Sequence, residues 1–278
     1  MYLSRAELDP ARRSTMIALT SPQKFHGAVE NSFSGERRRR LWRLDSLNGK
    51  LYLLLLSEEL PDLTGLCAQF GTGAAPEMRR YEPLLERVTP GSCWQFRLTA
   101  NPTRTRKDPA DPLARGALKP CYLEAEQEQW LLEQAGKHGF ALTEGAFRVT
   151  RKQTCHFRKN GKRPVTLLAV TYEGILQVTD PEAFREMLCQ GIGRGKAYGL
   201  GLMTILHGGR GYRSDPGGGH FGAAARPRHP CDPPCMPACT GWPMRSLWRW
   251  GVRRDWDSCT SGMSALSCTT LPTCTRRR

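Results

Sequence analysis

The chain has 278 residues, a length that suits one large domain or two small ones. Its formal net charge of +15 favours a polyanionic partner. Its longest apolar run, Leu51–Leu56, is far too short to span a bilayer, and no apolar signal core follows the start. Five cysteines are scattered singly through the first 206 residues, as is typical of reduced thiols. We therefore expect a cytoplasmic protein that does not insert into membranes.

The first 90 residues predict a strand, a helix, a hairpin and a second helix. Tyr2–Leu8 is predicted as a strand, and Ser21-Pro22 predicts an N-cap followed by a first-turn proline. Asn48-Gly49 lies between two apolar runs and predicts a tight hairpin, because both residues tolerate a positive φ. Asp62 predicts the start of the second helix. The apolar stripes of the two helices are Phe25, Ala28, Val29 and Phe33, and then Leu63, Leu66, Cys67 and Phe70.

The next hundred residues repeat this order. Alternating apolar residues predict a strand over Cys93–Ala100, and a helix is expected around Glu124–Lys137. Asn160-Gly161 again lies between two apolar runs and predicts a second hairpin. Asp180-Pro181 opens a helix that Gly191 ends, and Gly199–Leu206 is predicted as the last strand.

A unit of strand, helix, hairpin, helix and strand that occurs twice predicts an α+β fold. We expect two tandem ferredoxin-like (RRM-like) βαββαβ domains, over residues 1–90 and 91–206. The sequence leaves open whether Cys93–Ala100 ends the first unit or begins the second, because residues 71–90 are irregular. The aromatic motif of ordinary RNA-recognition domains is absent, so base stacking on the sheet is not predicted.

The segment 207–278 differs in composition from the rest of the chain. It lacks Lys, Glu, Ile, Asn and Gln and has no amphipathic period, so we expect a low-complexity, disordered tail. The missing residue types have AT-rich codons, which favours a frameshifted or read-through extension in a GC-rich genome. The alternative is a zinc site formed by His229, Cys231, Cys235 and Cys239.

Basic residues gather in two places. A loop rich in Pro and Gly begins at Asn101-Pro102, and the second predicted hairpin carries further cations. We expect the first group and the base of the hairpin to bind RNA phosphates, although a solvated charged surface is the simpler interpretation. The candidate RNA-binding residues in these two places are Arg104, Arg106, Lys107, Arg115, Lys119, Arg151 and Lys152.

A glycine-rich segment, GIGRGKAYGLG, follows a helix and precedes a strand. Walker loops and dinucleotide fingerprints have the opposite order, so neither is predicted. The backbone amides here, together with Arg194 and Lys196, could approach a phosphate chain closely; the alternative is a flexible connector. The glycines of this candidate RNA-binding segment are Gly191, Gly193, Gly195, Gly199 and Gly201.

Three histidines lie in the first 206 residues. His138 is at a helix end, where a cation would favour the negative end of the dipole, and His156 is on the second hairpin. His26 follows Phe25 and should emerge beside the buried stripe of its helix. Asp108 and Asp111 lack acidic partners, so no two-metal nuclease site is predicted. We expect any nuclease chemistry to use acid–base groups, with no metal and no cofactor.

Four features together resemble the CasE family of CRISPR RNA-processing endoribonucleases. These are the MYLS start, a His after a Ser-Pro cap, the Phe96–Pro102 segment, and GIGRGKAYGLGLMTI near residue 200. The resemblance covers about residues 1–206 and implies two ferredoxin-like domains. It implies His26 as the catalytic histidine, with basic helpers among Arg158, Lys159 and Lys162. Family members often carry a Tyr where this chain has Gln23, and Gly27 replaces a basic or polar residue.

The resemblance also implies a reaction and partners. The substrate would be the CRISPR repeat RNA hairpin, and the partners would be the resulting crRNA and the other Cascade subunits. Attack by the ribose 2′-OH would give a 2′,3′-cyclic phosphate and a 5′-OH, and the product hairpin would be retained. The alternatives are a non-catalytic RNA-hairpin-binding subunit of the same fold, which Gln23 and Gly27 favour, and a small-molecule enzyme on a ferredoxin-like scaffold.

Overall fold

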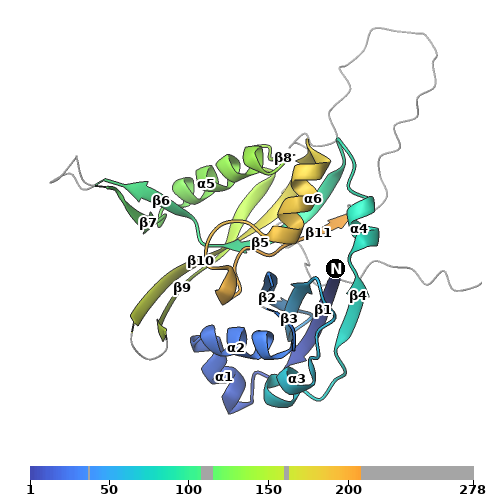
Figure 1. The fold of residues 1–278 in the computed structure, drawn as a ribbon. Coiled ribbons are helices and arrows are strands. Elements are labelled where there is room, and N and C mark those ends of the chain that lie inside the picture. Colours follow the sequence, from blue (N-terminus) through green and yellow to red (C-terminus); the bar gives the residue numbers. More distant parts are fainter. Residues whose placement is uncertain (37, 108–114, 160–162, 208–278) are drawn as a thin grey trace, which may run out of the picture.

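A computed structural model describes residues 1–36, 38–107, 115–159 and 163–207 of the chain (Figure 1). The predicted tail from residue 208 onward, with its alternative zinc ligands, lies outside these ranges. The predicted Asn160-Gly161 turn and Lys162 also lie outside them, as do Asp108 and Asp111. Within the described ranges, no helix combines the length and apolar character that a membrane crossing requires.

The first sheet is antiparallel and is built by residues 2–80. Its strands lie in the order β2-β3-β1-β4, which is the arrangement of a ferredoxin-like βαββαβ unit. Asn48 and Gly49 both have positive φ, of 51° and 78°, and they form the predicted turn between β2 and β3. The elements in chain order are β1 (Tyr2–Leu8), α1 (Arg13–Thr20), α2 (Gln23–Asn31), β2 (Arg40–Leu47), β3 (Lys50–Ser57), α3 (Thr64–Phe70) and β4 (Glu77–Arg80), and α4 (Glu82–Glu86) follows.

The second sheet repeats this topology. Its strands lie in the order β11-β5-β10, and β10 pairs on its other side with both β9 and β8. Its elements in chain order are β5 (Cys93–Ala100), α5 (Glu124–Lys137), β8 (Phe140–Ala141), β9 (Phe147–Lys159), β10 (Arg163–Val178), α6 (Pro181–Gln190), the 3-10 helix η1 (Lys196–Tyr198) and β11 (Met203–His207). The predicted α+β fold class with duplicated ferredoxin-like units is confirmed.

The topology answers the question that residues 71–90 left open. The short strand β4 pairs with β1 and completes the first sheet, whereas β5 pairs with β10 and β11 in the second. Cys93–Ala100 therefore begins the second unit. All four residues of β4 are exposed, so this edge strand has no apolar alternation for a sequence pattern to detect.

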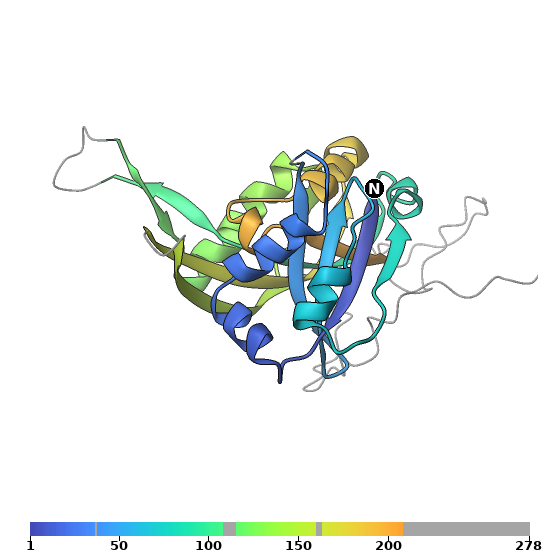
Figure 2. The same cartoon turned by 60° about the horizontal axis from the view of Figure 1, so that its bottom comes forward.

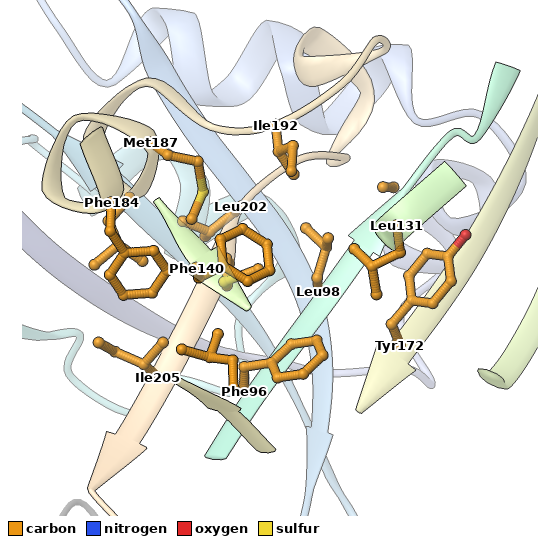
Figure 3. Close-up of a cluster of buried hydrophobic side chains, with 14 of the residues drawn as sticks. Phe96, Leu98, Leu131, Phe140, Tyr172, Phe184, Met187, Ile192, Leu202 and Ile205 are labelled. Atoms are coloured by element: carbon orange, nitrogen blue, oxygen red, sulfur yellow. The ribbon is translucent and has the colours of Figure 1, made fainter. Parts of the chain in front are cut away.

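Helices cover the outer faces of the two sheets (Figures 1 and 2). Helices α1, α2 and α3 pack on the first sheet, where Phe25 and Phe70 contact the core of β1 and β3. Helices α5 and α6 pack on the second sheet. Figure 3 shows this larger core, in which Leu131 and Phe184 from the helices lie in the same cluster as Phe96 of β5. The predicted stripes of α2 and α3 thus face the core of the first sheet, where Ala28, Phe33 and Cys67 are partly buried and the other stripe residues are buried.

A buried arginine connects the two sheets. The Arg43 side chain of β2 is 1% exposed and uses its donors on both units. It donates hydrogen bonds to the Asp45 carboxylate at 2.6 and 3.0 Å, and to the carbonyls of Arg97 and Leu202 at 2.7 and 2.8 Å. The guanidinium therefore joins β2 to β5 and to the segment before β11.

Several sequence predictions differ from the structure in detail. Helix α1 was not predicted, because it buries only the small residues Thr15 and Ala18 and leaves Met16 exposed. The predicted Ser21 N-cap is wrong: Ser21 ends α1, and Pro22 precedes α2 without a capping side chain. Asp62 does accept a hydrogen bond from the Thr64 amide at the start of α3.

Two strand predictions also need correction. The predicted basic loop contains a two-stranded hairpin of β6 (Thr103–Arg106) and β7 (Ala117–Pro120), whose short strands pair through the backbone. The last strand begins at Met203 rather than Gly199, because the positive φ of Gly199 and Gly201 interrupts the extended backbone. At its other end, the strand includes His207.

Candidate active site

His26 lies on the flank of α2, beside the face that packs on the first sheet. Phe25 and Val29 are fully buried on that face, whereas the His26 side chain is 20% exposed. This is the position that the sequence predicted, about 100° around the helix from the apolar stripe. The imidazole is therefore fixed by a packed helix and remains accessible to a ligand.

Two segments from the second unit approach this histidine. The Tyr198 ring of η1 meets the His26 ring edge-on, with centroids 6.4 Å apart. Tyr198 also packs against Phe157 of β9, with centroids 4.9 Å apart. Figure 1 shows the short orange helix η1 between α2 and the β9–β10 hairpin. Residues distant in sequence thus form one site where the two units meet.

The glycine-rich segment has the backbone geometry that its composition requires. All five of its glycines have positive φ, between 70° and 90°. At Gly199, a Cβ atom would lie 2.7 Å from the Trp42 ring, so only glycine lets η1 pack this closely on β2. The segment is therefore a shaped connector that places Tyr198 next to α2.

This packing corrects part of the predicted phosphate site. The amides of Gly191, Gly199 and Gly201 donate to the carbonyls of Met187, Lys196 and Thr99. These three amide groups are used within the protein and do not point to a phosphate. Gly193 and Gly195 remain candidate RNA-binding residues.

A carboxylate lies next to His26. Glu30, one helical turn further along α2, places Oε1 3.8 Å from His26 Nδ1. Its other oxygen accepts a hydrogen bond of 2.8 Å from Arg40 Nη1. The Arg40 side chain is 4% exposed and stacks over the Phe33 ring at 4.0 Å. The site thus contains an ordered series from a buried arginine through a glutamate to the histidine.

Two of the predicted basic helpers, Arg158 and Lys159, lie on β9. Phe157 faces Tyr198, and adjacent strand residues point to opposite faces, so exposed Arg158 lies on the face away from Tyr198. His156 shares that outer face, and its Nδ1 is 3.1 Å from Thr166 Oγ1. The side chains of Lys159 and Lys162 lie outside the described part of the chain.

Positive charge gathers near the glycine-rich segment. Burial, and then the charge of Arg39, lower the pKa of the half-buried Lys196. Burial, followed by the charges of Lys196 and Lys137, lowers the pKa of His138. The prediction that His138 acts as a cation at the end of α5 is therefore not supported, because its surroundings favour the neutral ring. Arg194 is exposed nearby in sequence.

Several other predicted RNA-binding cations already have partners on α5. The two arginines of β6 and one lysine of β9 form ion pairs with its glutamates, so RNA would have to compete for them. These pairs are Arg104–Glu133 at 2.6 Å, Arg106–Glu126 at 2.5 Å and Lys152–Glu124 at 2.6 Å. The remaining candidates, Lys107, Arg115, Lys119 and Arg151, are exposed.

Residues 1–206 match the family described as CRISPR associated protein. The chain belongs to this family. It is 33% identical over 220 residues to the CRISPR-associated endoribonuclease Cse3 of Thermus thermophilus, covering 74% of this chain and 99% of the relative. It is also 33% identical over 115 residues to the Cascade subunit CasE of Escherichia coli K12, covering 40% of this chain and 56% of that protein.

Solved structures agree with this assignment. A structure of Cse3 bound to a 19 nt RNA superposes with a TM-score of 0.62 at 28% identity, covering 74% of this chain and 100% of that one. A structure of Thermus thermophilus Cse3 bound to an RNA that represents a pre-cleavage complex also gives 0.62, at 27% identity, and covers 74% and 98% of the two chains. The predicted CasE resemblance is confirmed.

The candidate site contains residues that the sequence did not predict. Glu30 could have been found, because it lies four residues after His26 on a predicted helix. The approach of Tyr198 and Phe157 could not, because it depends on how the two units pack. Within the described residues, no three His, Cys, Asp or Glu side chains lie close enough together to ligate a metal ion.

Proposed function

We propose that this CasE-family protein is an endoribonuclease that cuts CRISPR repeat RNA hairpins without a metal ion and retains the hairpin product. The observation that carries the proposal is the position of His26, an accessible imidazole fixed where α2, η1 and β9 meet. The relatives support the substrate class, since similar chains are a CRISPR endoribonuclease bound to RNA and a Cascade subunit.

The proposed chemistry needs only acid–base and electrostatic groups. The ribose 2′-OH attacks the adjacent phosphate, and His26 either removes that proton or gives one to the departing 5′-oxygen. The products are a 2′,3′-cyclic phosphate and a 5′-OH. Lys196 and Arg194 are proposed to contact phosphates near the site, and Lys159 or Lys162 to stabilise charge on the phosphate that reacts. Arg158 is the weaker helper candidate, because it lies on the outer face of β9.

The product is proposed to stay bound because many cations contact the hairpin and none of these contacts depends on the broken bond. The basic β6–β7 hairpin extends from the body of the protein (Figures 1 and 2). It brings Arg104 opposite Lys119 across two paired strands. Such a basic arm suits a duplex backbone, and binding through it should weaken steeply as salt is raised.

Cleavage of a repeat hairpin in EDTA tests the proposal. The wild-type protein and a His156→Ala control should both cut, because His156 faces away from Tyr198, whereas His26→Ala should bind without cutting. A single deoxyribose at the cleavage site should block the reaction but not binding. Wild-type binding without cleavage would instead support a non-catalytic RNA-binding subunit, and cleavage of the deoxy RNA would exclude attack by the 2′-OH.

A further inference from the structure

We propose that Glu30 is a positioning residue for His26 and that Arg40 fixes Glu30 in turn. This inference rests on the proposed ribonuclease function and adds two residues to it. Neither is predicted to touch RNA. Their proposed role is to set the orientation and the tautomer of the imidazole before the substrate binds.

The geometry of α2 brings the two side chains together. Residues four apart lie on the same side of a helix, so Glu30 is directly adjacent to His26. The distance of 3.8 Å from Nδ1 to Oε1 is longer than a hydrogen bond. The carboxylate is nevertheless close enough to stabilise a proton on Nδ1 electrostatically.

Arg40 prevents Glu30 from moving freely. Its guanidinium donates to Glu30 Oε2 at 2.8 Å and to the Glu36 carbonyl at 3.2 Å, while it stacks on Phe33. Because the Arg40 side chain is almost completely buried, it has few alternative positions. One oxygen of Glu30 is thus occupied by the arginine, and the other is directed along the helix toward the imidazole.

A carboxylate beside Nδ1 has a defined chemical consequence. It favours the tautomer in which Nδ1 carries the proton, because that N–H is the group that can interact with a negative oxygen. Nε2 is then left to exchange a proton with RNA, and the carboxylate also stabilises the positive ring that forms when Nε2 accepts one. The geometry thus assigns Nε2 as the reacting nitrogen.

A purely structural role is the competing explanation, because the Glu30–Arg40 pair also joins α2 to β2. Glu30→Gln separates the two roles, since the amide keeps its shape and can still accept from Arg40 but has no negative charge. Glu58→Gln is the matched control. Glu58 pairs with Arg38 at 3.1 Å on the surface and has no part in the site.

The experiment measures three quantities on the full chain: the single-turnover cleavage rate, the affinity for uncleaved deoxy-substituted hairpin, and the melting temperature. Glu30→Gln should slow cleavage about 10- to 100-fold, less than the loss of a general acid or base itself. RNA affinity should stay at the wild-type value, whereas the melting temperature should fall somewhat, because the buried Arg40 guanidinium keeps a hydrogen bond to the amide but loses its charged partner. Glu30→Asp, which keeps the charge, should lose less activity, and Glu58→Gln should lose none.

A second readout follows the imidazole directly. In protein with 15N-labelled histidine, the His26 signals are identified by their absence in His26→Ala. The wild type should show protonated Nδ1, and Glu30→Gln should shift the population toward protonated Nε2. An unchanged tautomer together with an unchanged rate would overturn the proposal, as would a rate loss that disappears when cleavage is measured far below the melting temperature of the variant. If His26→Ala itself cleaved RNA, the proposed function would fail instead, so the two failures are distinguishable.

Discussion

Gly199→Ala tests whether close packing of the glycine-rich segment builds the site. Two costs follow from the structure. The backbone φ of +81° places an alanine in the left-handed region, which costs about 1–2 kcal/mol. The new methyl would also lie 2.7 Å from the Trp42 ring in a packed core, which costs about 1–3 kcal/mol more. The free energy of unfolding should therefore fall by about 2–5 kcal/mol.

Gly27→Ala is a control on the same site. Gly27 is exposed on α2, directly after His26, and a Cβ there would meet no atom within 4 Å. Alanine at this position should raise the free energy of unfolding by about 0.5–1 kcal/mol, because glycine weakens a helix interior.

Urea unfolding and single-turnover RNA cleavage together measure the effect of Gly199→Ala. Because the strain displaces η1 from β2, it should also move Tyr198 away from His26 and slow cleavage even in folded protein. If Gly199→Ala unfolds at the same urea concentration as the wild type, the packing argument is refuted. If it is destabilised but cleaves at the full rate, Tyr198 has no part in positioning His26.

The remaining predictions concern the junction between the units and the change of folding stability with pH. Arg43→Met should lower the free energy of unfolding by about 3–5 kcal/mol, because buried Asp45 loses its main partner. Adding Asp45→Leu should recover part of this loss, as measured by urea unfolding. A double variant that is less stable than Arg43→Met would contradict the prediction. His138 has a pKa below its ordinary 6.5, so as the pH falls from 7 the unfolded chain takes up this proton first and the folded state is destabilised. His138→Gln should therefore lose less stability than the wild type between pH 7 and pH 5, and equal losses in thermal melts would argue against a half-buried neutral ring.

Local patterns were sufficient for most of the fold. Asn48-Gly49 gave the first turn, and Asp180 caps α6 as expected by accepting hydrogen bonds from the Glu182 and Ala183 amides. The failures occurred where no local pattern exists. The edge strand β4 is wholly exposed, and β6 and β7 have four residues each and bury none of them fully, so backbone pairing rather than side-chain periodicity defines these strands.

The site was predictable only in part, for a related reason. His26 could be identified because its helix has a clear apolar stripe and because the family motif includes it. The contribution of the second unit depends on tertiary packing, which alternation and spacing do not encode. Among the glycines predicted to bind phosphate, Gly191 and Gly199 have positive φ and leave no room for a Cβ beside Leu41 and Trp42, so they pack the connector against β2. Gly193 and Gly195 stay predicted RNA-binding residues.

The distance in sequence between His26 and Tyr198 has a consequence for how the enzyme is made. The first sheet can pair within the first 80 residues, so on the ribosome it can fold long before the rest of the chain is synthesised. The partner ring arrives only with residue 198, just before the final strand β11. A nascent or prematurely terminated chain would therefore carry His26 without its completed surroundings, and the proposed active site would not yet be formed in a polypeptide that is still being translated.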